Sequence, residues 1–146
     1  MKGGVCVDTS FLMSLLVGDC HTERAREQVI SLGKPLVISQ LVELEHVNGV
    51  RQRVFRGEIT EHQALAVDKE YLRWRKEGSL VRGGMMVPAI WKSARKLGRD
   101  HTARLGTRSL DVLHVAFALA AEADLFWSFD DKQRVLAAAV GLKLNP

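Results

Sequence analysis

The sequence predicts an α/β protein in which helices cover both faces of a central parallel sheet. Short unbroken apolar runs, suited to buried strands, alternate along the chain with longer helix-forming segments. Parallel strands need crossover connections, which the intervening helical segments supply. At 146 residues, with 47% hydrophobic and 26% charged residues, the chain has the size and composition of one globular domain, which we expect to span residues 1–146.

Turn and cap residues mark the element boundaries in the first half of the chain. Ser39 and Thr60 are typical N-cap residues, and Gly33, Gly57 and Gly78 are typical helix ends. The elements that they delimit are a strand at 5–7, helices at 11–17 and 21–32, a strand at 36–38, and helices at 40–55 and 61–76.

The second half is predicted to continue the alternation. Pro88 suits the first turn of a helix that Gly98 ends, and a polar, Gly-containing loop is expected to follow as far as Ser109. Residues 110–121 are apolar on nearly every side, which predicts a helix buried on several faces. The other predicted elements are an edge strand at 80–81, a strand at 125–129, a helix at 131–139 and a short strand at 142–144.

The charge balance mildly favours a polyanionic partner. The formal net charge is +4 and the pI is near 9.3. The basic residues fall into three groups, and such groups more often form a solvated helix face than a phosphate-binding surface. The groups are Arg51, Arg53 and Arg56; Arg73, Arg75, Lys76 and Arg82; and Lys92, Arg95, Lys96 and Arg99.

The cysteines and the apolar runs bear on the compartment. Only Cys6 and Cys20 are present, without zinc-site spacing, so neither a disulfide framework nor a structural zinc is indicated. No signal-peptide core precedes Asp8, and no later stretch reaches the roughly 18 apolar residues of a membrane span. We therefore expect a soluble cytoplasmic protein with no membrane contact.

Acidic residues follow two of the predicted strands. Asp8 comes directly after the first strand, and Asp130 follows the strand at 125–129. Asp111 lies in the first turn of the apolar helix, and Glu43 or Glu45 lies early in the helix after the second strand. Since ligands bind at the carboxyl ends of parallel strands, these carboxylates are expected to converge there.

Such a cluster has a characteristic chemistry. Neighbouring carboxylates repel one another and raise each other's pKa, so a cluster is tolerable mainly when a hard cation compensates it. Oxygen ligands suit Mg²⁺ or Mn²⁺, which lower the pKa of a bound water and stabilise the leaving oxygen of a phosphodiester displacement. The pattern thus indicates metal-assisted phosphodiester chemistry.

Structural interpretations of the same acids stay open at this point. Asp8 and Asp130 each suit an N-cap, and Asp111 suits a helix N-terminus through the helix dipole. Glu43 and Glu45 point roughly 200° apart on a helix, so only one of them can enter the site.

His114 and the tryptophans have ordinary structural interpretations. His114 lies one turn after Asp111 on an apolar helix, where a satisfied core histidine is expected more often than a catalytic one. Trp74, Trp91 and Trp127 are dispersed among different elements, which favours core or interface positions over base-stacking platforms.

Four sequence pieces, in this order and spacing, resemble the PIN-domain ribonucleases, and within them the VapC-type toxins of toxin–antitoxin pairs. The resemblance covers nearly the whole chain. The pieces are VCVDTS at 5–10, ISQLVELE at 38–45, RSLDVLHVA at 108–116 and WSFD at 127–130.

The resemblance implies a three-layer α/β/α fold with strand order 3-2-1-4-5. It implies that Asp8, Glu45, Asp111 and Asp130 are the catalytic acids, and that Asp8, Asp111 and Asp130 bind Mg²⁺ or Mn²⁺. Glu45 is preferred to Glu43 because the family's glutamate falls six positions after the Ser that ends the strand, and Ser10 matches a small polar position.

The resemblance also implies a function. It is that of an endoribonuclease toxin, often dimeric, that acts on RNA and is neutralised by a small antitoxin protein. Two neighbours, Glu43 and Asp131, are the alternatives to Glu45 and Asp130.

Two other functions compete with this one. A PIN-like module that binds RNA or protein without cutting is disfavoured because all four acids are present. A phosphoacceptor regulatory domain would need an acidic pair near the first strand and a Lys after the last one, and neither pattern is apparent.

Overall fold

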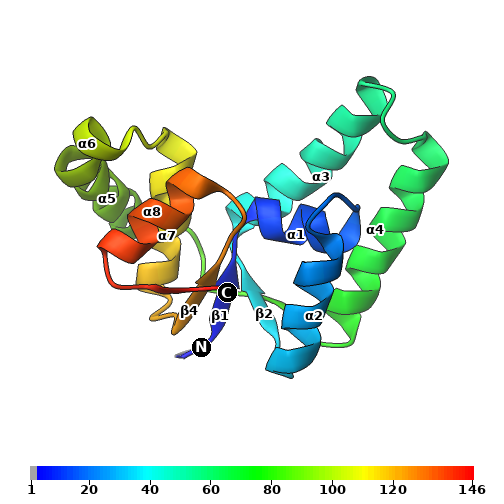
Figure 1. Ribbon diagram of the computed structural model, residues 1–146, viewed down its shortest axis with the longest axis horizontal. Helices are drawn as coiled ribbons and strands as arrows, with labels where there is room; N and C mark the ends of the chain where they lie inside the picture. Colours follow the sequence, from blue (N-terminus) through cyan, green and yellow to red (C-terminus); the bar gives the residue numbers. More distant parts are fainter. Residues whose placement is uncertain (1–2) are drawn as a thin grey trace.

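A five-stranded parallel sheet forms the centre of the computed structural model, which describes residues 3–146 (Figure 1). Its strand order is β3-β2-β1-β4-β5, and every neighbouring pair is parallel, as the resemblance predicts. The first strand of the chain is thus central and the crossovers run outwards in both directions. The strands are β1 (Val5–Val7), β2 (Leu36–Ile38), β3 (Leu80–Arg82), β4 (Leu125–Trp127) and β5 (Lys143–Leu144).

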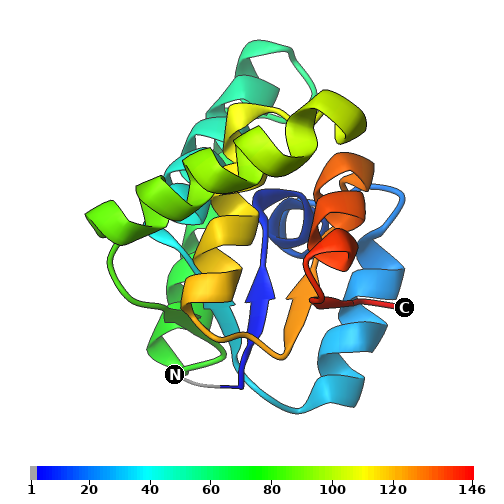
Figure 2. The ribbon, with the colours of Figure 1, turned by 90° about the vertical axis from the view of Figure 1, so that its left-hand side faces the viewer.

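Helices cover both faces of this sheet and give the predicted three layers. Figure 1 shows α1 to α4 on one side and α5 to α8 on the other, and Figure 2 shows α5 crossing the outer side of α7. The helices are α1 (Thr9–Leu16), α2 (Thr22–Leu32), α3 (Gln40–Phe55), α4 (Glu61–Lys76), α5 (Pro88–Leu97), the π-helical η1 (Gly98–Thr102), α6 (Ala103–Leu105), α7 (Ser109–Ala120) and α8 (Asp131–Ala139).

Alternate residues of each strand enter different cores because successive side chains point to opposite faces. In β1, Val5 and Val7 pack with α1 and α2, whereas Cys6 packs with α5, α7 and α8. The α7 helix is buried on several faces, as its apolar sequence predicts. The sheet edge at the carboxyl ends of β1 and β4 is therefore held rigidly between two cores.

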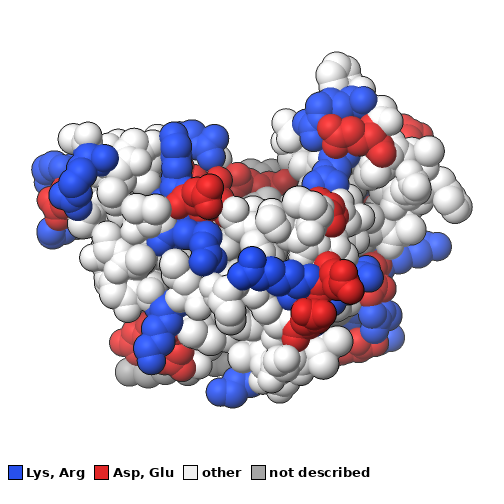
Figure 3. Space-filling view, viewed as in Figure 1, with Lys and Arg blue, Asp and Glu red and all other residues white. Residues whose placement is uncertain are grey.

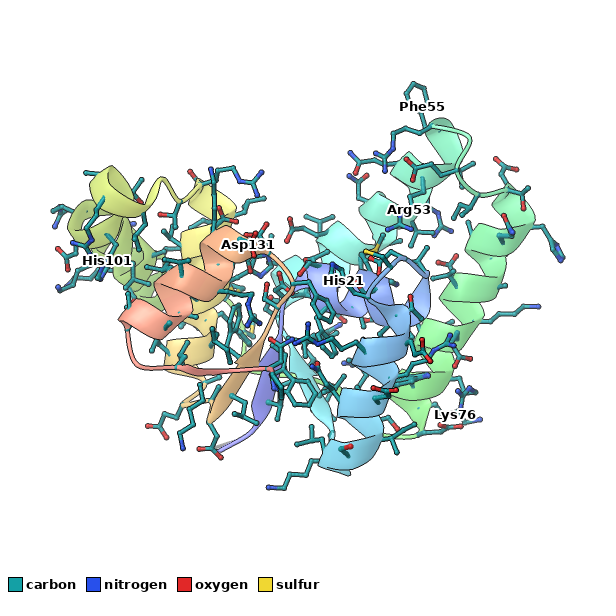
Figure 4. The ribbon with its side chains drawn as sticks, viewed as in Figure 1. His21, Arg53, Phe55, Lys76, His101 and Asp131 are labelled. Atoms are coloured by element: carbon teal, nitrogen blue, oxygen red, sulfur yellow. The ribbon has the colours of Figure 1, made fainter. Side chains whose placement is uncertain are left out.

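The α3 and α4 helices form a hairpin that projects beyond the sheet (Figure 1). They have a small core of their own, made by Val50, Ala64 and Val67. Ser39 and Thr60 cap these helices as predicted, each accepting a backbone N–H of the first turn. Phe55, at the tip, is 92% exposed and points away from the rest of the molecule (Figure 4).

The prediction of a polar loop between Gly98 and Ser109 is wrong. Gly98 has helical angles, so the chain continues through η1 and α6, and it stops at Gly106, whose φ of +67° is left-handed. A glycine ends a helix only where it adopts that conformation, and the sequence offered two candidates.

Three predicted elements at the sheet edge also shift. The strand expected at 125–129 ends at Trp127, because the backbone N–H of Ser128 donates to the Asn145 side chain and that of Phe129 to Ser10 Oγ. The last strand begins at Lys143 instead of 142, and the first helix begins at Thr9 instead of 11.

The three basic groups differ in their environment. In the first two, Arg51, Arg56, Arg73 and Arg82 form ion pairs with acidic residues of α3, α4 or the intervening turn. In the third, Lys96 pairs with Asp100, but no ion pair involves Lys92, Arg95 or Arg99 within residues 3–146. The solvated-face interpretation thus fits the first two groups better than the third.

The structure also describes the two cysteines and the lengths of the helices. Both cysteines are free, and burial raises the pKa of Cys6 to about 12. Among the helices within residues 3–146, none combines the length and apolar character needed to cross a membrane.

Candidate active site

Four acidic side chains from distant parts of the chain line one cavity of about 510 Å³. Asp8 follows β1, Glu45 lies on α3, Asp111 on α7, and Asp130 follows β4. The cavity therefore lies at the carboxyl edge of the sheet, where sequence reasoning expected the acids to meet. Its other lining residues are Thr9, Ser10, Arg108, Ser109, Leu110, His114 and Gln133.

Asp8 is the most deeply placed of the four, with no solvent exposure. Its Oδ1 accepts the Phe11 N–H at 2.9 Å, which makes Asp8 the N-cap of α1. Its carboxylate also accepts hydroxyl protons from Ser10 at 2.8 Å and Ser128 at 2.9 Å. Burial raises the pKa of Asp8, and these hydrogen bonds offset only part of that effect.

Glu45 lines the same cavity and is held by two donors. Its Oε1 accepts the Thr9 hydroxyl at 2.8 Å and lies 2.6 Å from Nε2 of His114. Partial burial on its own would raise the pKa of Glu45, but the hydrogen bond and charge of His114, with the Thr9 bond, bring it below its ordinary value. The Glu45 side chain is therefore ionised at neutral pH.

Asp111 and Asp130 are linked by Arg108. The Arg108 backbone N–H donates to Asp111 Oδ2 at 2.8 Å, and its guanidinium lies 3.3 Å from the same oxygen and 3.4 Å from Asp130 Oδ2. Gln133 joins the same pair, since its side chain lies 3.3 Å from Asp111 Oδ1 and its backbone N–H donates to Asp130 Oδ1 at 3.0 Å. The two acids thus sit on either side of one cation.

The neighbouring alternatives lie elsewhere. Glu43 turns to the opposite side of α3, where it accepts the Tyr71 hydroxyl at 2.9 Å and pairs with Arg82. Asp131 is exposed at the start of α8 and does not line the cavity (Figure 4). Of each pair, the structure brings only Glu45 and Asp130 to the cavity.

The structural interpretation of the three aspartates does not exclude the functional one. Each aspartate caps or begins a helix and also lines the cavity. Asp8 caps α1, Asp130 caps α8, and Asp111 accepts a backbone N–H at the start of α7. A cap residue follows a strand and precedes a helix, so its carboxylate already lies at the sheet edge.

His114 is buried and satisfied, as expected, but it also lines the cavity through its contact with Glu45. Sequence reasoning missed Arg108, Gln133 and Ser128 as site residues. Arg108 and Gln133 each lie three positions from an acid, the spacing of a capping box, and this was the signal that could have found them.

The tryptophans do not behave alike. Trp127 is buried, and Trp74 packs at the edge of the core beside α2. Trp91, in contrast, is 49% exposed on α5, so of the two positions expected for it, core or interface, the core is excluded.

The four acids offer oxygen ligands for a divalent cation. Asp8 is fully buried, and within residues 3–146 it accepts hydrogen bonds only from neutral donors. Such a charge needs a compensating cation, and oxygen donors of this kind are those that Mg²⁺ and Mn²⁺ prefer. The donor set therefore fits a hard cation.

The side chains of the described residues are not arranged around a metal position in this structure. No group of three or more His, Cys, Asp or Glu in the described part of the chain is arranged to hold a metal ion. Asp111, Asp130 and Glu45 instead contact protein donors, namely Gln133, Arg108 and His114.

A hollow between the two sides of the molecule carries both signs of charge. Figure 3 shows acidic side chains at its base and Lys and Arg on the walls above them. A negative ligand could be guided to the acids by such walls.

The chain is an α/β/α protein with an acidic site at the carboxyl edge of its parallel sheet. A comparison with protein families identifies which family has this fold. The family described as PIN domain matches residues 5–139, so the chain belongs to the PIN-domain family.

A solved structure gives the same fold. The crystal structure of VapC20 from Mycobacterium tuberculosis, described as a toxin that cleaves the sarcin-ricin loop, superimposes with a TM-score of 0.70. The match has 18% sequence identity and covers 95% of this chain and 96% of that one. No curated protein sequence matches the chain.

Proposed function

We propose that this protein is a divalent-metal-dependent endoribonuclease that hydrolyses RNA phosphodiester bonds. One observation carries the proposal, namely that Asp8, Glu45, Asp111 and Asp130 line a single cavity at the carboxyl edge of a PIN-domain sheet. Several buried or half-buried carboxylates in one cavity are costly to a fold, which favours a functional reason for them.

The aspartates form the cation site of the proposal. Asp8, Asp111 and Asp130 would hold Mg²⁺ or Mn²⁺, which when bound would lower the pKa of a water and stabilise the leaving oxygen. Ser10 and Ser128 fix the Asp8 carboxylate through hydrogen bonds of 2.8 and 2.9 Å. The rotamer of Asp8 is thus set before substrate arrives.

Glu45 is the proposed proton acceptor. Both of its hydrogen bonds reach Oε1, and within residues 3–146 no donor reaches Oε2. Its lowered pKa keeps it in the basic form at neutral pH, so Oε2 can take a proton from an attacking water. His114 and Thr9 are positioning residues, because they hold Oε1 and thereby orient Oε2.

RNA is the proposed substrate because the approach to the acids is basic. Lys and Arg line the walls of the hollow (Figure 3), and Lys92 and Arg95 on α5 and Arg99 in η1 form no ion pair within residues 3–146. Phosphate contacts supply most of the sequence-independent affinity for nucleic acid.

We further propose that the protein is the toxin of a type II toxin–antitoxin pair, acting in the cytoplasm as one domain. The fold likeness to VapC20 supports this, as do apolar side chains on the α3–α4 hairpin that a cognate antitoxin could cover. The exposed ones are Leu44, Val47, Phe55, Leu65 and Leu72. The homodimer expected from the resemblance stays a prediction.

The test is cleavage of RNA by the purified protein with Mg²⁺, Mn²⁺ or EDTA, beside matched pairs of variants. Asp8→Asn and Glu45→Gln should each reduce the rate by at least about a hundredfold. Their neighbours Asp131→Asn and Glu43→Gln, which lie outside the cavity, should cut at nearly the rate of the unchanged protein.

Three outcomes would contradict the proposal. Cleavage that persists in EDTA would contradict the proposed metal dependence. Full activity of Asp8→Asn would contradict the assignment of the active site. RNA that is bound but never cut under any of these conditions would select the non-catalytic binding module instead.

A further inference from the structure

A second cavity, of about 340 Å³, adjoins the acidic one. The two share Arg108 and Ser109 in their linings. The second cavity lies between α5, η1 and the start of α7, and Figure 2 shows α5 crossing in front of α7. Its walls include Trp91, Arg95, Thr102, Thr107, Val112 and Leu113.

One wall of this cavity is aromatic and the floor is apolar. Trp91 is 49% exposed, whereas Val112 and Leu113 are buried. The half-exposed indole ring leaves apolar surface in contact with water beside the apolar floor. Every nucleobase has a face that can stack on such a ring. Stacking of this kind is independent of hydrogen-bond readout, so it tolerates any base.

A polar edge lies opposite the apolar floor. The hydroxyl oxygens of Thr102 and Thr107 lie 2.6 Å apart, and one of them donates to the other. The accepting hydroxyl then keeps its own proton for another acceptor. Base edges carry such acceptors, and a hydroxyl pair at this place could receive one.

The cations of α5 indicate which partner fits. Arg95 and Arg108 line this cavity and no acidic residue among the described ones does, whereas Lys92, Lys96 and Arg99 line a neighbouring cavity with Asp100, the partner of Lys96. In a symmetric dimer through this face the same cations would meet themselves, which disfavours a second copy of the chain. A polyanion is favoured by the same charges.

The backbone beside the cavity is also unusual. Gly98 and Thr102, which line it, are the two ends of the π-helical η1. Such turns are rare and occur frequently at functional sites.

We propose that this cavity is a nucleobase subsite, in which an unpaired RNA base next to the scissile phosphate stacks on Trp91. This inference rests on the proposed ribonuclease function and specifies its substrate, namely a single-stranded segment whose bases are free to leave the stack. Arg108 lies between the two cavities and would contact the phosphate that joins the two nucleotides.

The experiment uses Asp8→Asn protein, which should bind RNA without cutting it, and a fluorescent single-stranded oligonucleotide in Mg²⁺. Trp91→Ala should weaken binding by about tenfold or more, and Trp91→Phe should retain most of the affinity. Val135→Ala, which removes an equally exposed apolar side chain on α8, should leave affinity unchanged. Thermal unfolding checks that each variant is folded.

An abasic scan separates stacking from general loss of affinity. One abasic position along the oligonucleotide should weaken binding to the Trp91 protein and have no effect on Trp91→Ala, because the same contact is then removed twice. Duplex RNA of the same charge, whose bases stay stacked, should bind both proteins equally.

The outcomes distinguish this inference from the function on which it rests. RNA bound and cleaved normally by Trp91→Ala, or loss of affinity at no single abasic position, would overturn the subsite alone. Failure of the unchanged protein to bind or cut any RNA would overturn both. A change from dimer to monomer in Trp91→Ala, with RNA affinity unaltered, would assign the face to self-association and reject the subsite.

Discussion

The guanidinium of Arg108 lies 3.3 Å from the carboxylate of Asp111, and it reaches Asp130 with its other end. A cation of the chain itself thus stands where the proposed metal ligands come together. Arg108 is largely exposed, so it can leave the carboxylates without any rearrangement of the core.

Replacing this arginine should therefore strengthen metal binding. Arg108→Gln removes a positive charge that repels and displaces the cation, so its affinity for Mn²⁺ is expected to rise by about threefold to tenfold, measured by calorimetry. Arg104→Gln, an exposed change outside the acidic cavity, serves as the control. Weaker Mn²⁺ binding by Arg108→Gln would mean that the arginine supports the site.

The buried charge of Asp8 should be visible in the stability of the metal-free protein. Burial raises the folded pKa of Asp8 above its ordinary 3.8, so the ionised side chain costs stability. This cost is absent below the unfolded pKa and sets in as the pH rises through the folded pKa.

Asp8→Asn removes that charge at nearly constant volume. It should stabilise the protein by about 1 to 3 kcal/mol at neutral pH in EDTA, as measured by urea unfolding. In Mn²⁺ the advantage should vanish, since the cation then compensates Asp8 in the unchanged protein. A less stable Asp8→Asn protein in EDTA would show that the hydrogen bonds to the carboxylate outweigh its desolvation.

Arg73 of α4 and Arg99 of η1 should differ in their effect on the salt dependence of RNA binding. Arg99→Gln removes a cation without an ion pair among the described residues, so the slope of log affinity for RNA against log salt should become shallower by about one. Arg73 pairs with Glu70 and Glu77, so Arg73→Gln should leave the slope unchanged. Equal slopes for both variants would exclude the α5 end from the RNA contact.

His46 should make folding sensitive to mild acid. Burial lowers its pKa from 6.5 to about 4, with smaller effects from Asp68 and Arg51, and neither ring nitrogen has a hydrogen-bond partner among the described residues. The unfolded chain takes up the proton first. The stability due to neutral His46 is therefore complete above pH 6.5 and lost as the pH falls toward 4.

The loss should amount to roughly 2 to 4 kcal/mol over this interval, measured by urea unfolding at several pH values. His46→Phe, which keeps a ring beside Tyr71, should flatten the profile between these limits. An unchanged profile would assign the acid sensitivity to other groups.

Local rules predicted most of the fold. Ser39 and Thr60 fixed helix starts because a side-chain cap needs only its own first turn. The loop after Gly98 was mispredicted because the angles of a glycine depend on tertiary packing, and Gly106 adopted the left-handed conformation instead. The strand order could be predicted only from the family resemblance. Strands of two or three residues carry no sequence signal that shows which strands pair.

The acids of the site were predictable because each follows a strand or opens a helix. Two long-range contacts were not predictable, those of Arg108 with Asp130 and of His114 with Glu45, because they join residues 22 and 69 positions apart in sequence. Such contacts depend on how helices pack, which composition and spacing do not encode.

Three of the four acids also secure helix ends, Asp8 for α1, Asp111 for α7 and Asp130 for α8. Alanine at any of these positions would therefore cost about 1 kcal/mol of folding energy besides the carboxylate. An alanine substitution at these positions would then reduce activity and stability together, so an alanine scan could not tell the two effects apart. Amide replacements keep one oxygen to accept the helix N–H while they remove the charge and the second accepting oxygen, so they disturb the helix ends less than alanine does.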